Sequence, residues 1–214
     1  MTEPQPDSPV SFGYKISWCA VRSPDCGAIA SALGFAEPSR VSWGRGIEAA
    51  YAGSVFITPA IDGWTLVVGD AVAPGVERAD GNWRSNLVEL SERFGEVQMF
   101  TTHRVVELHG WALARHGRVE RAYCYVGESG EVRYDEGGQT PAEQSLGFNF
   151  GDPDSPEAED ETYWEREDLF PCEASVMSLA AKWSVSPIEL SEDSGSPALG
   201  LVPESKRKPW WRFW

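Results

Sequence analysis

Four short segments rich in β-branched and aromatic residues follow one another in the middle of the chain, and they constrain the fold most. Short turns such as His116-Gly117 and Glu128-Ser129-Gly130 separate them. Strands joined so closely must run antiparallel, because a parallel connection needs about a dozen residues or more. We therefore expect an antiparallel meander formed by residues 96–104, 105–115, 118–127 and 131–136.

The turn at His116-Gly117 also predicts how the two strands beside it pair. Counting outward from a two-residue turn places His109 directly opposite Cys124, on a face shared with Trp111 and Glu120. Side chains on both faces of this hairpin are largely apolar. We therefore expect it to lie in the centre of the sheet, covered on each side.

The first half of the chain predicts further elements. Asp62-Gly63 lies between two β-prone stretches, and both residues tolerate the positive φ of a tight hairpin turn, so residues 55–69 are predicted to form a hairpin. Pro59 lacks an N–H, which should place that arm at a sheet edge or at a bulge. The other predicted elements are a strand at 10–22, a helix at 25–33 and an amphipathic helix at 83–94.

These patterns together predict the α+β class, a mostly antiparallel sheet of hairpins and a meander with helices packed on it. Two strand-helix-hairpin units in series are compatible with a pseudo-duplicated βαββ arrangement. One more amphipathic helix is expected to dock on the sheet through a stripe made of Val176, Leu179, Ala180 and Trp183.

We expect one globular domain over residues 10–190, because 214 residues leave little room for two domains. An acidic loop at 151–168 belongs to this domain. The flanking segments lack periodicity and are expected to lie outside it, as a disordered N-terminus at 1–9, a Ser-, Gly- and Pro-rich linker at 191–205 and a basic, aromatic tail at 206–214.

Acidic residues outnumber basic residues by 33 to 18, which gives a formal net charge of −15. A surface of that sign repels phosphate, so nucleic-acid binding loses its main source of affinity and a cationic protein becomes the expected partner. The acidic loop should face that partner. Its predicted binding residues are Asp152, Asp154, Glu157, Glu159, Asp160, Glu161, Glu165, Glu167 and Asp168.

The tail combines four cations with four aromatic residues. Three uses are compatible with this composition: folding back on the acidic body, docking in a groove of a partner, or contact with an anionic membrane. The residues that would carry any of these contacts are Lys206, Arg207, Lys208, Trp210, Trp211, Arg212 and Trp214.

No phosphate-binding loop and no metal-ligand spacing is present, so we expect neither a cofactor nor a metal. The best catalytic candidates are His109 and Cys124, because an imidazole beside a thiolate makes a nucleophile, with His103 on the preceding strand. Packing and hydrogen bonding inside a sheet is the more common use of such residues.

The N-terminal residues do not resemble a signal peptide and no apolar stretch is long enough to span a membrane, so we expect a cytoplasmic location. The cysteines are few and unevenly spaced, which predicts buried, reduced thiols at Cys19, Cys26, Cys124 and Cys172. Packing in the core or at its rim is expected for Trp18, Trp43, Trp64, Trp83 and Trp111.

These features favour a non-catalytic, acidic protein-binding domain. In its small size, acidity, many tryptophans and lack of a catalytic motif, the chain resembles the immunity proteins of bacteria. This resemblance of composition implies a toxin-neutralising role. Two alternatives stay open: a small enzyme with a pocket on the 96–136 sheet that uses His109 and Cys124, and an adaptor recruited through its basic, tryptophan-rich tail.

Overall fold

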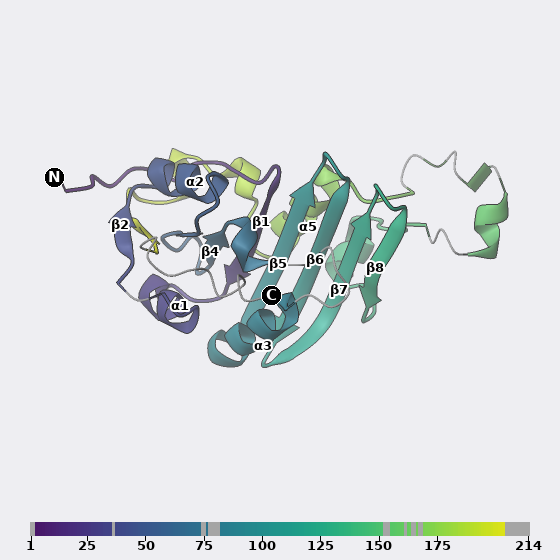
Figure 1. Cartoon of the computed structure of the whole chain (residues 1–214), viewed down its shortest axis with the longest axis horizontal. Coiled ribbons are helices and arrows are strands. Elements are labelled where there is room, and N and C mark those ends of the chain that lie inside the picture. Colours follow the sequence, from purple (N-terminus) through teal and green to yellow (C-terminus); the bar gives the residue numbers. More distant parts are fainter. Residues whose placement is uncertain are drawn as a thin grey trace.

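The computed structural model describes residues 3–35, 37–73, 76, 82–151, 155–160, 162–163, 166 and 169–203. Within these residues the chain folds into a single antiparallel sheet with helices on both of its faces (Figure 1). The predicted α+β class is therefore confirmed.

The sheet has nine strands. From one edge to the other they are β2 (Ser39–Val41), β9 (Gly200–Val202), β3 (Phe56–Ile57), β4 (Thr65–Val68), β1 (Ile16–Val21), β5 (Glu96–His103), β6 (Leu108–Arg115), β7 (Arg118–Val126) and β8 (Glu131–Glu136). The strand-helix-hairpin order of the first half does not recur in the second, where a helix precedes four consecutive strands.

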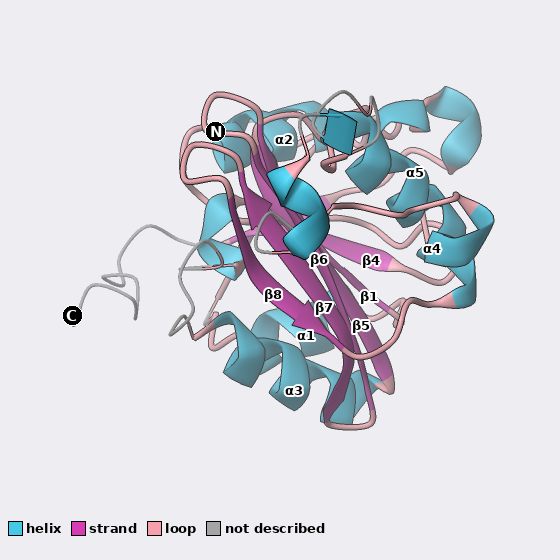
Figure 2. Ribbon diagram, turned by 90° about the vertical axis from the view of Figure 1, so that its right-hand side faces the viewer, coloured by secondary structure: helices cyan, strands magenta, loops and turns pink. Residues whose placement is uncertain are grey.

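Five α-helices among the described residues cover the sheet. Figure 2 shows α1 (Cys26–Ala32) and α3 (Trp83–Phe94) on one side, and α2 (Trp43–Tyr51), α4 (Pro141–Ser145) and α5 (Glu173–Trp183) on the other. Each side has its own core, because successive residues of a strand point to opposite faces.

The tryptophans fill these two cores, as expected. Trp18 stacks on Phe100 with 5.1 Å between the ring centroids, on the α5 side of the sheet. Trp83 packs edge-on against Tyr134 on the α3 side. Burial is nearly complete for Trp18, Trp43, Trp83 and Trp111, and Trp64 is 6% exposed. Aromatic burial of this extent is a large part of the hydrophobic stabilisation of the fold.

The predicted turn at Asp62-Gly63 forms, but the arm before it is placed differently from the prediction. Asp62 and Gly63 have positive φ angles of 49° and 82°, and they close the hairpin through paired backbone hydrogen bonds of 2.8 Å between Ile61 and Trp64. This turn is confirmed. The arm that contains Pro59 is not at the sheet edge, because β9 pairs with β3 on its outer side, and Pro59 itself follows the end of β3.

The meander of β5 to β8 is also confirmed, but the predicted register is wrong beyond the first two pairs. Arg115 pairs with Arg118 and Ala114 with Val119, as the two-residue turn requires. The next pair is Leu113 with Arg121, so one extra residue on β7 forms a β-bulge. Every later pair is displaced by one residue, which exchanges the faces of the β7 side chains relative to the prediction.

The chain outside residues 10–190 takes part in the fold, contrary to expectation. Residues 200–202 form β9 inside the sheet, so the predicted linker is wrong at this point. Asp7 forms a β-bridge with Ala198, and its carboxylate accepts hydrogen bonds from the backbone N–H groups of Trp43 and Gly44 at the start of α2. A carboxylate there stabilises the exposed N–H groups of a helix.

Candidate functional site

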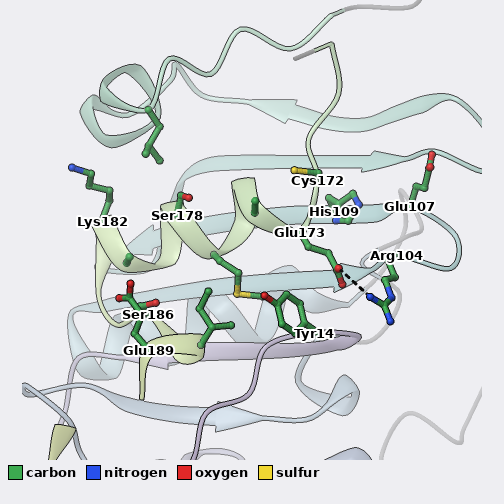
Figure 3. Close-up of a pocket in the computed structure, with 15 residues that line it drawn as sticks. Tyr14, Arg104, Glu107, His109, Cys172, Glu173, Ser178, Lys182, Ser186 and Glu189 are labelled. Carbon is green, nitrogen blue, oxygen red and sulfur yellow. Dashed lines mark ion pairs between the residues drawn. The ribbon is translucent and has the colours of Figure 1, made fainter. Parts of the chain in front are cut away.

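An open groove with a volume of about 1010 Å³ runs along α5 (Figure 3). One end lies at the turn between β5 and β6, where Arg104 and Glu107 line it. The other end lies at the short turn Pro187–Glu189. Its floor includes His109 from β6 and Met177 from α5, both of which are buried.

His109 is the most buried polar group in the groove, at 4% exposed. Its Nδ1 atom shares a hydrogen bond of 3.0 Å with the hydroxyl of buried Thr102 on the neighbouring strand. Burial, assisted by the nearby charge of His103, lowers the pKa of His109 to about 4. The imidazole is therefore neutral at physiological pH, and it can accept or donate one further hydrogen bond.

His103 lies on the other face of the sheet. Its Nε2 atom is 3.2 Å from Oδ1 of Asp70, which also accepts a hydrogen bond of 3.0 Å from the backbone N–H of Ser17. Burial would raise the pKa of Asp70, but the hydrogen bond and charge of His103 outweigh it, so the pKa falls below its usual value. His103 is thus paired with Asp70 and does not line the groove.

The predicted pair of His109 and Cys124 does not form. His109 lies opposite Tyr125, and Cys124 lies opposite Gly110. The β-bulge in β7 causes this difference, because it shifts Cys124 to the α3 side of the sheet, where its thiol is fully buried and 3.7 Å from the carbonyl oxygen of Val76. The thiol and the imidazole are on opposite faces, so the nucleophile design proposed for them is wrong.

The four cysteines are free thiols, but only Cys19 and Cys124 are buried. Burial raises the pKa of Cys19 to about 12. Cys26 is partly exposed, and Cys172 is exposed at the N-cap of α5, where it lines the groove. The prediction that all four are buried is therefore wrong for these last two residues.

Glu173 and Arg104 form a loose ion pair at the β5–β6 end of the groove. Nη1 of Arg104 is 4.0 Å from Oε2 of Glu173, which is too far for a hydrogen bond. Oε1 of Glu173 is buried and has no hydrogen-bond partner among the described residues, and the side chain is only 18% exposed. Figure 3 shows Glu173, Arg104 and Tyr14 gathered at this end of α5.

Two exposed apolar side chains belong to the lining of the same groove. Tyr14 and Ile188, which are 49% and 38% exposed, line it. The hydroxyl of Tyr51 donates a hydrogen bond of 2.9 Å to the carbonyl oxygen of Tyr14, and Val105, 78% exposed, lies between two lining residues. Of the five large apolar residues that are exposed in the described chain, Tyr14 and Ile188 line the groove, and Val10, Tyr51 and Val105 do not.

The acidic loop is described only in part. Glu157, Glu159 and Asp160 are exposed around the short turn Pro156–Glu159, which projects beyond β8 in Figure 1. A backbone hydrogen bond of 2.7 Å from Gly151 to Leu169 closes the base of the loop. The other predicted binding residues, Asp152, Asp154, Glu161, Glu165, Glu167 and Asp168, lie outside the described residues, as does the whole predicted tail from Lys206 to Trp214.

A second buried ionic group has a structural role. Glu143 of α4 and Arg121 of β7, exposed by 1% and 3%, form an ion pair of 2.8 Å. The carboxylate also accepts hydrogen bonds from the indole of Trp111 and from the backbone and hydroxyl of Thr140, at 2.9, 2.8 and 2.8 Å. These contacts satisfy both carboxylate oxygens and attach α4 to the sheet.

No cluster of three potential metal ligands occurs in the part of the chain that the structure describes. Across the same residues, no helix is both long and apolar enough to cross a bilayer.

Comparisons with protein-family models, with curated proteins and with solved structures found no match to this chain. The site must therefore be interpreted from its own geometry and chemistry.

His109 was the groove residue predicted as a site from the sequence, but its surroundings were not predicted. Glu173 is one of 33 acidic residues, and nothing in the local pattern distinguishes its carboxylate from the others. Tyr14 and Ile188 belong to segments that are distant in sequence, and the fold brings these segments together, with a backbone hydrogen bond of 3.1 Å from the N–H of Phe12 to the carbonyl oxygen of Pro187. A local sequence pattern cannot predict contacts between segments so distant in sequence.

Proposed function

We propose that this chain is a non-catalytic protein-binding domain for a cationic partner, and that the groove along α5 is its docking surface. The observation that carries the proposal is a groove with a buried apolar residue, Met177, and two exposed apolar residues, Tyr14 and Ile188, in its lining, in a molecule of net charge −15. Exposed apolar side chains that line a concavity are typical of an interaction site.

The charge of the molecule supports the choice of partner. A net charge of −15 attracts cations over distances of about a Debye length and raises the rate of encounter with a basic surface. Apolar contacts in the groove would then hold the complex after encounter, since buried apolar area rather than surface charge supplies most of the affinity.

A catalytic use of the groove has less support. His109 is a weak base because its pKa is about 4, and the thiol proposed to act with it points into the opposite core. General base catalysis works best with a pKa near the operating pH. The toxin-neutralising role implied by the resemblance to immunity proteins, a cytoplasmic location and recruitment through the tail remain finer proposals within this function.

Synthetic peptides test the proposal directly. We expect an amphipathic peptide of lysine and leucine to bind, with an affinity that falls as salt rises, and its glutamate and leucine counterpart not to bind. The double variant Tyr14→Ser, Ile188→Ser should weaken binding about tenfold, because it removes an aromatic and an aliphatic contact.

The matched control is Val10→Ser, since Val10 is 37% exposed, close to the 38% of Ile188, but does not line the groove. Calorimetric titration measures the affinity of each variant for the peptide, and it is compared only among variants of equal folding stability. Equal binding of the acidic and basic peptides, or an equal loss of affinity in the control, would refute the proposal. The toxin-neutralising role needs a separate test. If a gene beside this one encodes a protein that stops growth when expressed alone, co-expression of this chain should restore growth.

A further inference from the structure

We propose that Glu173 and His109 form an anchor site for one basic side chain of the partner, a lysine ammonium or an arginine guanidinium, at the β5–β6 end of the groove. This inference rests on the proposed function and specifies the chemistry of the occupant. The partner segment would place this cation between the two residues and its neighbouring apolar side chains on Tyr14 and Ile188.

The carboxylate of Glu173 lacks the hydrogen bonds that a mostly buried carboxylate requires. Its Oε1 atom is buried without a partner among the described residues, and its Oε2 atom has only the 4.0 Å contact with Arg104. An unsatisfied charged acceptor loses hydration without compensation. An incoming N–H donor at Oε2, or at Oε1 after a rotation of the side chain, would restore that loss, so the site favours a donor over an acceptor.

His109 supplies the second acceptor. Its Nδ1 atom is held by Thr102, and no described residue hydrogen-bonds its Nε2 atom. When Nδ1 carries the proton and donates to the threonine hydroxyl, Nε2 presents a lone pair to the groove. Because burial keeps the ring neutral at physiological pH, His109 does not repel a cation. The lining of the groove therefore contains one anionic and one neutral acceptor.

The surroundings fit the stem of a basic side chain. Tyr14 offers an aromatic face at this end of the groove, and Met177 provides an apolar floor. Lysine and arginine bury their methylene groups on such surfaces and place the charge at the far end. Arg104 is the competing cation, but its side chain is 62% exposed and makes no hydrogen bond to Glu173, so it can turn into solvent.

The test compares the affinity of the lysine and leucine peptide for four forms of the full chain. Glu173→Gln should weaken binding at least tenfold, since a hydrogen bond to a charged group is lost. The matched control Glu89→Gln removes the same charge from an exposed position on α3 and should change affinity by less than about twofold. Arg104→Gln should strengthen binding, because the competing cation is gone.

Chemical protection of Cys172 locates the bound peptide. Cys172 lines the groove beside Glu173, so the peptide should slow its alkylation and leave the alkylation of Cys26 unchanged. Denaturant unfolding of each variant shows that the comparison is made on folded protein.

The outcomes separate the two proposals. If Glu173→Gln and Glu89→Gln behave alike while Tyr14→Ser, Ile188→Ser still weakens binding, the anchor is wrong and the docking groove stands. If Arg104→Gln weakens binding, Arg104 does not compete with the peptide for the carboxylate of Glu173, and the anchor is again wrong. If the peptide binds without protecting Cys172, both the anchor and the proposed groove are wrong.

Discussion

The buried pair of Glu143 and Arg121 gives the sharpest stability prediction. Replacing Glu143 with alanine removes the acceptor for four donors: the Arg121 guanidinium, the Trp111 indole and both groups of Thr140. Arg121 would keep its ion pair of 2.5 Å with Asp135, but its Nε atom and the Trp111 indole are buried and could not regain water in place of Glu143. A buried donor left without its acceptor costs about 1–3 kcal/mol, so for two such donors we expect a loss of about 3 kcal/mol in the free energy of unfolding.

Urea unfolding followed by tryptophan fluorescence measures this loss. The control is Glu120→Ala, which breaks a similar contact of 2.7 Å with Arg115, but between side chains that are 46% and 42% exposed. An exposed pair contributes about 1 kcal/mol or less. If Glu143→Ala costs no more than Glu120→Ala, water reaches Arg121 in the folded protein and the reasoning from burial is refuted.

Three further predictions concern other parts of the molecule. Lowering the pH from 7 toward 4 should reduce the free energy of unfolding by up to about 3 kcal/mol through His109. In the unfolded chain this histidine is protonated below about pH 6.5, whereas in the folded protein it stays neutral until about pH 4. A His109→Gln variant that loses the same stability over this pH range would contradict the prediction. Gly46→Ala should lower the free energy of unfolding by about 1–3 kcal/mol, because the added Cβ atom would lie 2.2 Å from the ring of Phe56. A melting temperature at or above that of the parent protein would show that the ring can move aside. Mass spectrometry should find Cys172 alkylated long before Cys124, and the reverse order would contradict the burial described above.

Much of the fold was accessible to local reasoning. The Asp62-Gly63 turn needs positive φ at both residues, and few other dipeptides satisfy that need. The amphipathic pattern at 83–94 and the glycine after it predicted α3 with its observed bounds. These elements are determined by their own residues, and distant contacts do not alter them.

The wrong predictions share a physical cause. In each case the structure depends on contacts with residues distant in sequence, or on a strand that is buried on both faces. Both faces of β6, and of β7 from Arg121 onward, are buried, so no alternation of polar and apolar residues identifies the bulge beside Arg121. Strand β9 is three residues long and exists because β2 and β3 flank it. The approach of α5 to β6 is likewise tertiary, and for this reason the contribution of Glu173 to the site could not be predicted.

A cationic, partly apolar segment is proposed to bind in the groove along α5. Backbone amide NMR during titration with the lysine and leucine peptide locates the residues that it contacts. We expect saturable shift changes at Tyr14, His109, Glu173 and Ile188, with the amides of α3 unaffected. Changes confined to Glu157, Glu159 and Asp160 in the acidic loop, or changes that never saturate, would contradict the claim.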